Sequence, residues 1–233
     1  MTQTLRAGDI NDFGATELGA TLGLDFEGRV FLAGGAFKTL IHGRPPRDLD
    51  LWAPTPHDRN LIIKRLLARG ARVMDRHPYC DVLWLNGRQL EVPDRAGPST
   101  LESRLARFDL GMSAVGVELA AGRLRTVVHP LAKASVRRRA VLLLKPLVNW
   151  KHALGTLARA RRYAEELGWT VPADEEDAIW SMFMAQPADE QQRMIDRYAH
   201  TAVPGWGVLE EALSRCHSSN WSPSAIGASG VSA

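Results

Sequence analysis

Residues 30–51 contain two strand-like runs on either side of a glycine pair, and this arrangement limits the fold strongly. The apolar run 30–33 ends at Gly34–Gly35, and the pattern over 36–41 then predicts a short helix. The next run, 48–51, alternates aspartate and leucine with period two, which predicts a strand with both carboxylates on one face. A strand, a tight turn, a short helix and a second strand therefore follow one another directly.

The remaining pattern predicts an α+β fold, in which a small mixed sheet with helices is followed by an all-helical part. Strand-like runs lie at 79–85, 88–92, 112–119 and 123–128, and Asn86-Gly87 between the first two is a strong hairpin signal. Helical patterns lie at 57–69, 101–107, 131–139, 150–167, 174–185, 188–200 and 208–216. We expect a sheet-containing domain over 1–130, a helical domain over 131–216 and a disordered tail over 217–233.

The composition is that of an ordinary globular protein. Hydrophobic residues make up 45% of the 233-residue chain and charged residues 24%. No window approaches the ~18 consecutive apolar residues that a membrane span needs. The start of the chain lacks a basic segment followed by an apolar run, so we expect a cytoplasmic protein that binds no membrane. Cys80 and Cys216 have no cysteine or histidine partner at ligand spacing, which predicts neither a zinc site nor a disulfide.

Basic residues concentrate in the middle third of the chain, although the net charge is only +3. The basic residues of this region are Arg137, Arg138, Arg139, Lys145, Lys151, Arg159, Arg161 and Arg162. Their concentration predicts a surface for an anionic partner. An ordinary solvated basic face is the alternative for such a run taken alone.

Asp48 and Asp50 are candidate ligands for a divalent metal ion. Residues two apart on a strand point to the same face, so these carboxylates are expected roughly 6 to 7 Å apart, close enough to share one metal ion or bracket two. Glu91 occupies a period-two position on the run 88–92 and is expected to supply a third carboxylate from a neighbouring strand. Such oxygen ligands suit Mg²⁺ in phosphoryl transfer. A bare Asp-x-Asp is otherwise a solvated strand end.

The glycine pair upstream favours the metal-site interpretation. Without side chains at Gly34 and Gly35, backbone N–H groups can approach phosphate oxygens closely, and the start of the following helix adds a favourable dipole. A phosphate-binding turn and a two-metal carboxylate site thus follow each other along the chain. This order predicts that the protein handles a nucleoside triphosphate with Mg²⁺.

The segment FLAGGAFKTLIHGRPPRDLDLWAPT resembles the head-domain signature of the tRNA CCA-adding enzymes and bacterial poly(A) polymerases, which belong to the DNA polymerase beta superfamily of nucleotidyltransferases. LEVPDRA is similar to the strand that carries the family's third acidic residue. LESRLARFDLGMSAVGVEL is similar to the family's Arg-Arg-Asp-Phe-Thr-Ile-Asn-Ala segment, with Asp109 in the place of the aspartate. TLARARRYAEELGW resembles the helix of the family's neck, so the likeness covers about residues 28–169. The resemblance implies a polymerase-beta type head followed by a helical neck and body.

Candidate nucleotide-binding residues follow from the resemblance and from the helical pattern. In the head they are Gly34, Gly35, Lys38, Arg47, Arg107 and Asp109. In the helical part, a basic stripe lies beside the apolar stripe on a helical wheel. We expect Lys145 or Lys151 to contact the triphosphate, and Arg159 or Arg162 to contact the triphosphate or the acceptor. An ordinary basic helix surface is the alternative for these four residues.

Departures from the family pattern bear on the reaction. The family's Val-Arg-Asp after the glycine pair is Phe-Lys-Thr at 37–39, and its Arg-Arg-Asp is Arg-Phe-Asp at 107–109. The Glu-Asp-x-x-Arg pattern with which the family's neck recognises ATP and CTP falls at His152, Ala153 and Thr156. None of these three side chains presents the same hydrogen bonds to a base. We therefore expect no ordered addition of C, C and A.

Several tryptophans lie in informative places. Trp52 directly follows the Asp-x-Asp run and either stacks on a base or packs in the core or at its rim. Trp84, Trp180 and Trp206 lie in apolar patterns and are expected in the core.

The expected function is Mg²⁺-dependent transfer of a nucleoside monophosphate from a triphosphate to an acceptor hydroxyl, with Asp48, Asp50 and Glu91 as the metal ligands. RNA, including a tRNA 3′ end, is the favoured acceptor because of the resemblance and the basic middle third. Nucleotidylation of a protein or a small molecule, as in toxin-like or antibiotic-modifying members of the superfamily, is one alternative. Another is a protein that binds nucleotide without turnover, which the retained carboxylates argue against.

Overall fold

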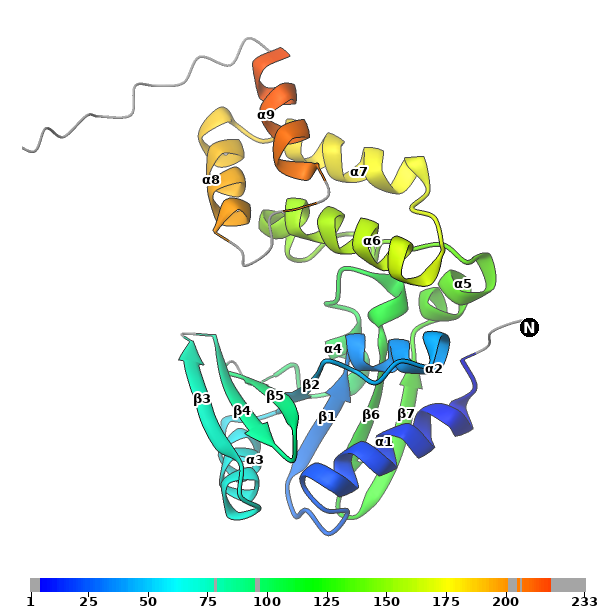
Figure 1. Cartoon of the computed structure of the whole chain (residues 1–233), viewed down its shortest axis with the longest axis vertical. Helices are drawn as coiled ribbons and strands as arrows, with labels where there is room; N and C mark the ends of the chain where they lie inside the picture. Colours follow the sequence, from blue (N-terminus) through cyan, green and yellow to red (C-terminus); the bar gives the residue numbers. More distant parts are fainter. Residues whose placement is uncertain (1–4, 78, 95–96, 201–204, 206, 219–233) are drawn as a thin grey trace, which may run out of the picture.

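The computed structural model describes residues 5–77, 79–94, 97–200, 205 and 207–218. Within these ranges, a seven-stranded sheet forms one end of the molecule and a group of helices the other (Figure 1). The strands are β1 (Arg29–Ala33), β2 (Asp48–Trp52), β3 (Arg72–His77), β4 (Cys80–Leu85), β5 (Arg88–Pro93), β6 (Val115–Ala120) and β7 (Arg123–Val128). They lie in the order β3-β4-β5-β2-β1-β6-β7; the central pair β2–β5 is parallel and the others are antiparallel. The expected α+β fold with a mixed sheet is confirmed.

Helices pack against the sheet and form the other end of the described chain (Figure 1). Those that accompany the sheet are α1 (Ala7–Thr21), α2 (Thr39–His42), α3 (Pro56–Ala68), α4 (Leu101–Leu105) and α5 (Pro130–Arg138). The helical part consists of α6 (Ala153–Leu167), α7 (Ala173–Met184), α8 (Ala188–Ala199) and α9 (Val208–Ser218). No helix in the described ranges has the length and apolar character that crossing a bilayer requires.

Most predicted helices are confirmed with small shifts at their ends. The helices predicted at 57–69, 131–139, 174–185, 188–200 and 208–216 correspond to α3, α5, α7, α8 and α9. The helix predicted at 150–167 begins as a 3-10 turn over Trp150–His152 before α6 starts. Because α9 extends to Ser218, the first two residues of the predicted disordered tail are helical. The rest of that tail, 219–233, lies outside the described residues, as does Trp206.

Two elements at the sheet were not predicted. Helix α1 contains Gly8, Gly14 and Gly19, which lower helix propensity and obscure its apolar pattern. Gly14 lets α1 approach β6, because a Cβ at this position would lie 2.6 Å from Cγ2 of Val117. Strand β3 reads Arg-Val-Met-Asp-Arg-His, which lacks the alternation of a half-buried strand. It forms nevertheless by pairing with β4 at the edge of the sheet.

Three predictions near the site need correction. The strand predicted at 112–119 begins only at Val115, because Gly111–Ser113 form a 3-10 turn packed on α5. The helix predicted at 101–107 ends at Leu105. The prediction that Trp84 lies in the core is wrong, since the residue is 44% exposed. Its neighbours on β4 occupy the buried face, and period two places Trp84 on the other.

The two faces of the sheet differ. Helices α1 and α3 cover one face, and the other face carries the carboxylates. Leu49 and Leu51 are fully buried on β2 and belong to the cluster that α1 and α3 cover. On the opposite face, α4 packs against Phe31 through Leu101 and Leu105. Alternation along β2 therefore directs Asp48 and Asp50 away from the covered core, toward the face on which α4 lies.

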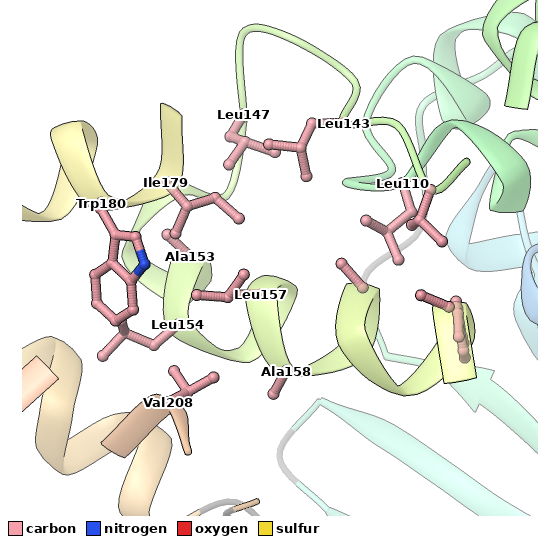
Figure 2. Close-up of a cluster of buried hydrophobic side chains, with 14 of the residues drawn as sticks. Leu110, Leu143, Leu147, Ala153, Leu154, Leu157, Ala158, Ile179, Trp180 and Val208 are labelled. Atoms are coloured by element: carbon pink, nitrogen blue, oxygen red, sulfur yellow. The ribbon is translucent and has the colours of Figure 1, made fainter. Parts of the chain in front are cut away.

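A second apolar core joins the helical part to this face. Leu154 and Leu157 of α6 pack near Ile179 and Trp180 of α7, together with Val208 of α9 (Figure 2). Trp180 is buried, as predicted. Because these contacts occupy one side of α6, the residues on its other side are free to face the sheet.

Candidate active site

Three carboxylates lie on one face of the sheet at the junction of β2 and β5. Asp48 and Asp50 alternate with buried leucines along β2. The parallel register pairs Asp50 with Glu91 and Asp48 with Gln89. Paired residues of neighbouring strands share a face, so Glu91 lies beside Asp50. The structure thus brings together the three residues that the sequence predicted as metal ligands.

Basic and amide groups hold the outer two carboxylates. Arg47 donates to Oδ2 of Asp48 from Nη2 at 2.6 Å and from Nε at 2.8 Å. Nε2 of Gln89 donates to Oε1 of Glu91 at 2.8 Å. At Asp50, burial raises the pKa to about 7, and the neighbouring charges of Glu91 and Asp48 add to the increase. The site therefore concentrates negative charge that a cation would stabilise.

The donor set fits a magnesium ion that shares its ligands with a bound phosphate. In the described parts of the chain, no group of three or more His, Cys, Asp or Glu side chains lies close enough together to hold a metal ion by itself. Mg²⁺ usually takes one or two protein carboxylates and completes its shell with substrate phosphates and water. Asp48, Asp50 and Glu91 supply hard oxygen ligands of this kind. They suit a metal that arrives with an anionic substrate better than a structural metal held by protein alone.

The glycine turn lies directly against this carboxylate group. Gly34 has φ 112° and ψ −143°, a backbone conformation that residues with a side chain rarely adopt. A Cβ on Gly34 would also lie 3.2 Å from Oδ2 of Asp50. The Gly34 N–H donates to the Val115 carbonyl at 3.1 Å. A phosphate cradle therefore has to use the amides after Gly34, where a 3-10 turn starts at Gly35.

A basic cleft of about 220 Å³ opens beside Asp48 and Gly35 and is bounded by α6. Lys38 Nζ lies 3.5 Å from the centroid of the Tyr163 ring and 3.2 Å from Oε2 of Glu166. Arg162 lines the same cleft, with Nε 3.6 Å from Oε1 of Glu166. Glu166 thus neutralises two cations that a polyphosphate could bind in its place.

A central cleft of about 240 Å³ lies between Gly34, Asp50 and α6. Here Asp109 forms an ion pair with Arg159 and accepts a hydrogen bond from Thr156 Oγ1 at 2.8 Å. Burial alone would raise the pKa of Asp109, but these two partners outweigh it and lower the pKa. The Asp109 carbonyl accepts from the Leu144 N–H at 2.8 Å, which fixes the backbone here. Asp109 therefore joins the head to α6 as an ionised group.

An aromatic cleft of about 630 Å³ lies on the other side of Asp50 and is also lined by Glu91. Strand β2 continues to Trp52, so period two places this side chain on the face of the carboxylates. Trp52 meets Phe108 edge to face, with ring centroids 6.0 Å apart. Cζ of Arg104 lies 4.1 Å from the Trp52 ring centroid. Sequence reasoning missed Arg104, because it lies on the short helix α4 and enters this cleft only through the packing of that helix on the sheet.

The structure gathers most of the predicted nucleotide-binding residues around the carboxylates. Those that line the three clefts are Gly34, Gly35, Lys38, Arg47, Arg107, Asp109, Arg159 and Arg162. Lys145 and Lys151 do not line these clefts. Lys145 Nζ lies 2.8 Å from Glu175, and Lys151 Nζ lies 5.4 Å from the Trp150 ring. Their role in nucleotide binding stays a prediction.

The three positions that the resemblance aligned with the base-recognising residues of a CCA-adding enzyme neck carry no acid and no arginine. Ala153 is fully buried in the helical core. Thr156 is 2% exposed, and its hydroxyl is committed to Asp109. Burial lowers the pKa of His152, and nearby Arg197 and Arg159 lower it further. These three side chains therefore present neither a carboxylate nor a guanidinium to a base.

The raised pKa of Asp50 makes the stability of the metal-free protein depend on pH. Because the folded state favours the protonated carboxyl, its contribution is fully present below the ordinary value of 3.8 and is lost as pH rises through about 7. Asp50→Asn removes the charge and keeps the shape. We expect its thermal midpoint to exceed that of the unmodified protein by a margin that grows up to about pH 7, at roughly 2–4 °C per kcal/mol. Melting curves between pH 4 and 8 without divalent metal measure this margin.

Asp9→Asn, at an exposed carboxylate of α1, is the matched control for this comparison. Its thermal midpoint should follow that of the unmodified protein at each pH. A margin for Asp50→Asn that is absent, or that stays constant across the pH range, would contradict the assignment of a buried, charge-repelled carboxylate at this position.

Comparison with solved structures identifies the architecture. No family model and no curated protein matches the sequence. A CCA-adding enzyme in complex with CTP superposes with a TM-score of 0.57 at 13% identity, over 94% of this chain and 56% of that one. The Thermotoga maritima CCA-adding enzyme in complex with tRNA gives 0.55 at 12%, over 95% and 55%. A tRNA nucleotidyltransferase with a primer tRNA and an incoming ATP analogue gives 0.54 at 17%, over 88% and 58%.

These similarities show the fold of the chain. The chain spans only 55% to 58% of the length of these three solved structures. Within that span it has the polymerase-beta-like nucleotidyltransferase fold, as the segment around the glycine pair and the Asp-x-Asp strand predicted.

Proposed function

We propose that this chain, which has the polymerase-beta-like nucleotidyltransferase fold, uses Mg²⁺ to transfer a nucleoside monophosphate from a nucleoside triphosphate to an acceptor hydroxyl. The observation that carries the proposal is the register pair of Asp50 and Glu91 beside Gly34, with a basic cleft on one side and an aromatic cleft on the other. One site thus offers separate places for a polyphosphate and for an acceptor, and carboxylates lie between them.

The basic cleft is suited to the triphosphate. Lys38 and Arg162 exchange their contacts with Glu166 for phosphate oxygens, and the amides after Gly34 approach the same group. Asp48 and Asp50 would hold the Mg²⁺. When bound, the ion would neutralise the phosphates and orient the acceptor hydroxyl. Product pyrophosphate leaves from the basic cleft, where Glu166 again neutralises the two cations.

Glu91 belongs to the acceptor side of the site. It lines the aromatic cleft but neither of the other two clefts. Its Oε1 accepts a hydrogen bond from Gln89, which orients the carboxylate. In this position Glu91 can accept the proton that the acceptor hydroxyl loses as its oxygen attacks the α-phosphate. The bond between the α- and β-phosphates breaks in the same reaction, and pyrophosphate is the leaving group.

An RNA 3′ end is the proposed acceptor. The solved structures with this fold include complexes with tRNA, CTP and an ATP analogue, which supports a nucleic acid acceptor and a nucleotide donor. Two guanidinium groups beside aromatic rings in the aromatic cleft support the same class of acceptor. A screen tests the assignment: the protein is incubated with each α-labelled triphosphate, Mg²⁺ and either total RNA or RNA-free cell extract. Label in RNA supports the proposal, whereas label in a protein or a small molecule moves the activity to another acceptor.

The site should not build an ordered C, C, A end. Rejecting a wrong base strongly requires polar groups that remain unpaired when that base binds. His152, Ala153 and Thr156 do not supply them, and Thr156 is already bonded to Asp109. Given a tRNA without its 3′ CCA and all four triphosphates, we expect one type of nucleotide added, or none. Sequencing of the 3′ ends measures this, and ordered C, C, A products would show that other residues select the base.

A further inference from the structure

Strand β3 is the outermost strand at one end of the sheet, and within the described part of the chain no strand lies beside its outer edge (Figure 1). Such an edge carries backbone N–H and C=O groups with which another strand can pair. Residues 72–76 of β3 are all exposed. The opposite end of the sheet differs, because α1 packs against β7 and none of the exposed large hydrophobic residues of the described chain lies on that strand.

Exposed apolar side chains are concentrated around β3. Five of the seven exposed large hydrophobic residues in the described chain lie between positions 67 and 84, from the end of α3 to β4. They are Leu67, Val73, Met74, Tyr79 and Trp84, and Met74 on β3 is 63% exposed. Single exposed apolar residues are ordinary, but their concentration along an open sheet edge indicates an interaction surface.

A β-bulge in β3 decides which of its side chains share a face. Arg72 lies opposite Trp84 of β4, and Asp75 lies opposite Val82, so three steps along β3 correspond to two steps along β4. Met74 is the extra residue in this register shift. Trp84 and Val82 are two apart and share a face of β4, so Arg72 and Asp75 also share a face. Without the bulge, residues three apart would point to opposite faces.

The order of charges makes this edge complementary to itself. Two copies of β3 can run antiparallel about a two-fold axis perpendicular to the sheet, so that Arg72 of each copy lies opposite Asp75 of the other. These residues lie on one face, as directly opposed residues of a sheet do. The same register places Val73 of each copy opposite Met74 of the other. Two pairs of opposite charge and two apolar pairs therefore form at once.

We propose that β3 is a dimerisation edge, which pairs antiparallel with β3 of a second copy of this chain and joins the two sheets into one. The paired segment, six residues long, would span roughly 20 Å. Residues 72–75 line none of the three clefts, so the dimer changes no cleft lining. Dimerisation does not depend on the proposed transfer reaction.

Charges and bulges on an edge strand usually prevent pairing with another chain. On β3 they select the partner and the register instead, because the bulge aligns one cation with one anion and not with a like charge. The second arginine of the strand, Arg76, lies with Nε 4.0 Å from Oδ1 of Asp81 on β4. Its charge is therefore partly balanced within its own sheet.

Sedimentation equilibrium of the full chain over a wide range of protein concentration measures the dimer. We expect a reversible equilibrium between monomer and dimer. Asp75→Arg places guanidinium groups opposite each other twice and should raise the dimer dissociation constant at least about tenfold, and Arg72→Asp should do the same with carboxylates. The double variant Arg72→Asp with Asp75→Arg restores both pairs in the same register. Its dissociation constant should return to within about threefold of that of the unmodified protein.

Further variants test the apolar pairs and the choice of edge. Met74→Lys places an edge-protecting charge opposite Val73 and should also raise the dissociation constant about tenfold. Arg123→Asp is the matched control, since it reverses an exposed charge on β7 at the other end of the sheet and should leave the constant within about twofold. Far-ultraviolet circular dichroism should be the same for every variant, because all the substituted residues are exposed.

Several results would overturn the dimerisation edge. A chain that stays monomeric at every concentration is one, and a dimer that survives both Asp75→Arg and Met74→Lys is another. Dissociation by Arg123→Asp in place of Asp75→Arg would move the interface to β7. A double charge reversal that fails to restore the dimer would show that Arg72 and Asp75 do not meet across it.

Discussion

Replacing Asp48 and Asp50 together by alanine should reduce nucleotidyl transfer by at least roughly a thousandfold while leaving the fold intact. Both side chains lie on the partly open face of β2, and the core leucines of the strand are unaffected. The substitution also removes the charge repulsion that raises the pKa of Asp50. The ion pair of Asp48 with Arg47 is lost as well, but Arg47 is largely exposed, so this loss should cost little stability. Steady-state transfer with a labelled triphosphate and a melting curve of the same preparation measure the two effects.

A double substitution at exposed carboxylates is the matched control. Asp9→Ala with Asp12→Ala on α1 removes the same charge at residues that line none of the three clefts and should leave transfer within about twofold. If the Asp48 and Asp50 double variant retained comparable transfer, the two aspartates would be solvated strand-end residues and the metal site would have to lie elsewhere.

Gly34→Ala should impair both stability and transfer, and more strongly than Gly35→Ala. At Gly34 the backbone has φ 112°, and a Cβ would lie 3.2 Å from Oδ2 of Asp50. Such a conformation costs about 1–3 kcal/mol for a residue with a side chain, and Asp50 would be displaced as well. At Gly35 the nearest atom to an added Cβ is Tyr163 Oη at 3.4 Å, an ordinary contact. Denaturant unfolding gives the stability, and transfer rates give the activity.

Gly70→Ala separates backbone strain from the effect on the site. Gly70 has φ 91°, but an added Cβ there meets nothing within 4 Å. Gly70→Ala should lower the free energy of unfolding about as much as the backbone strain in Gly34→Ala does. It should leave transfer by the folded protein unchanged. For Gly34→Ala we expect transfer to fall by at least about tenfold, even under conditions in which the variant is fully folded. Full transfer in Gly34→Ala would mean that the turn does not position Asp50.

Gly35→Val tests the phosphate-binding role of the turn separately. The added branches would enter the basic cleft, which Gly35 lines together with Lys38. Triphosphate affinity should therefore fall, whereas binding of an RNA single strand should not. Unaltered triphosphate affinity would place the nucleotide outside this cleft.

Local patterns were sufficient to predict the centre of the candidate site. Alternation over β2 predicted which face carries Asp48 and Asp50, and the Asn86-Gly87 turn predicted the hairpin that leads to Glu91. The parallel pairing of β2 with β5 could not be predicted from local pattern, because it depends on the order of strands in the sheet. That pairing is what makes Glu91 the neighbour of Asp50.

The residues that sequence reasoning missed depend on tertiary packing. Arg104 is one of several arginines in a polar segment, and only the packing of α4 on the sheet buries it beneath Trp52. The helical pattern does not distinguish Glu166 from an ordinary surface carboxylate. It contacts Lys38 because α6 lies next to the glycine turn in the folded chain. The exposure of Trp84, in contrast, follows from the period of two along β4, because Leu83 and Leu85 on either side of it occupy the buried face.

The proposed nucleotidyl transfer can be tested by following both ends of the triphosphate in parallel reactions. The protein, Mg²⁺ and single-stranded RNA are incubated in parallel with ATP labelled at the α- or the γ-phosphate, and then with the other triphosphates in the same way. We expect α-label joined to the RNA 3′ end, γ-label released as an equal amount of pyrophosphate, and neither in the Asp48 and Asp50 double variant. Label from the γ-phosphate in the RNA, or α-label transfer that survives the double substitution, would contradict the proposed transfer.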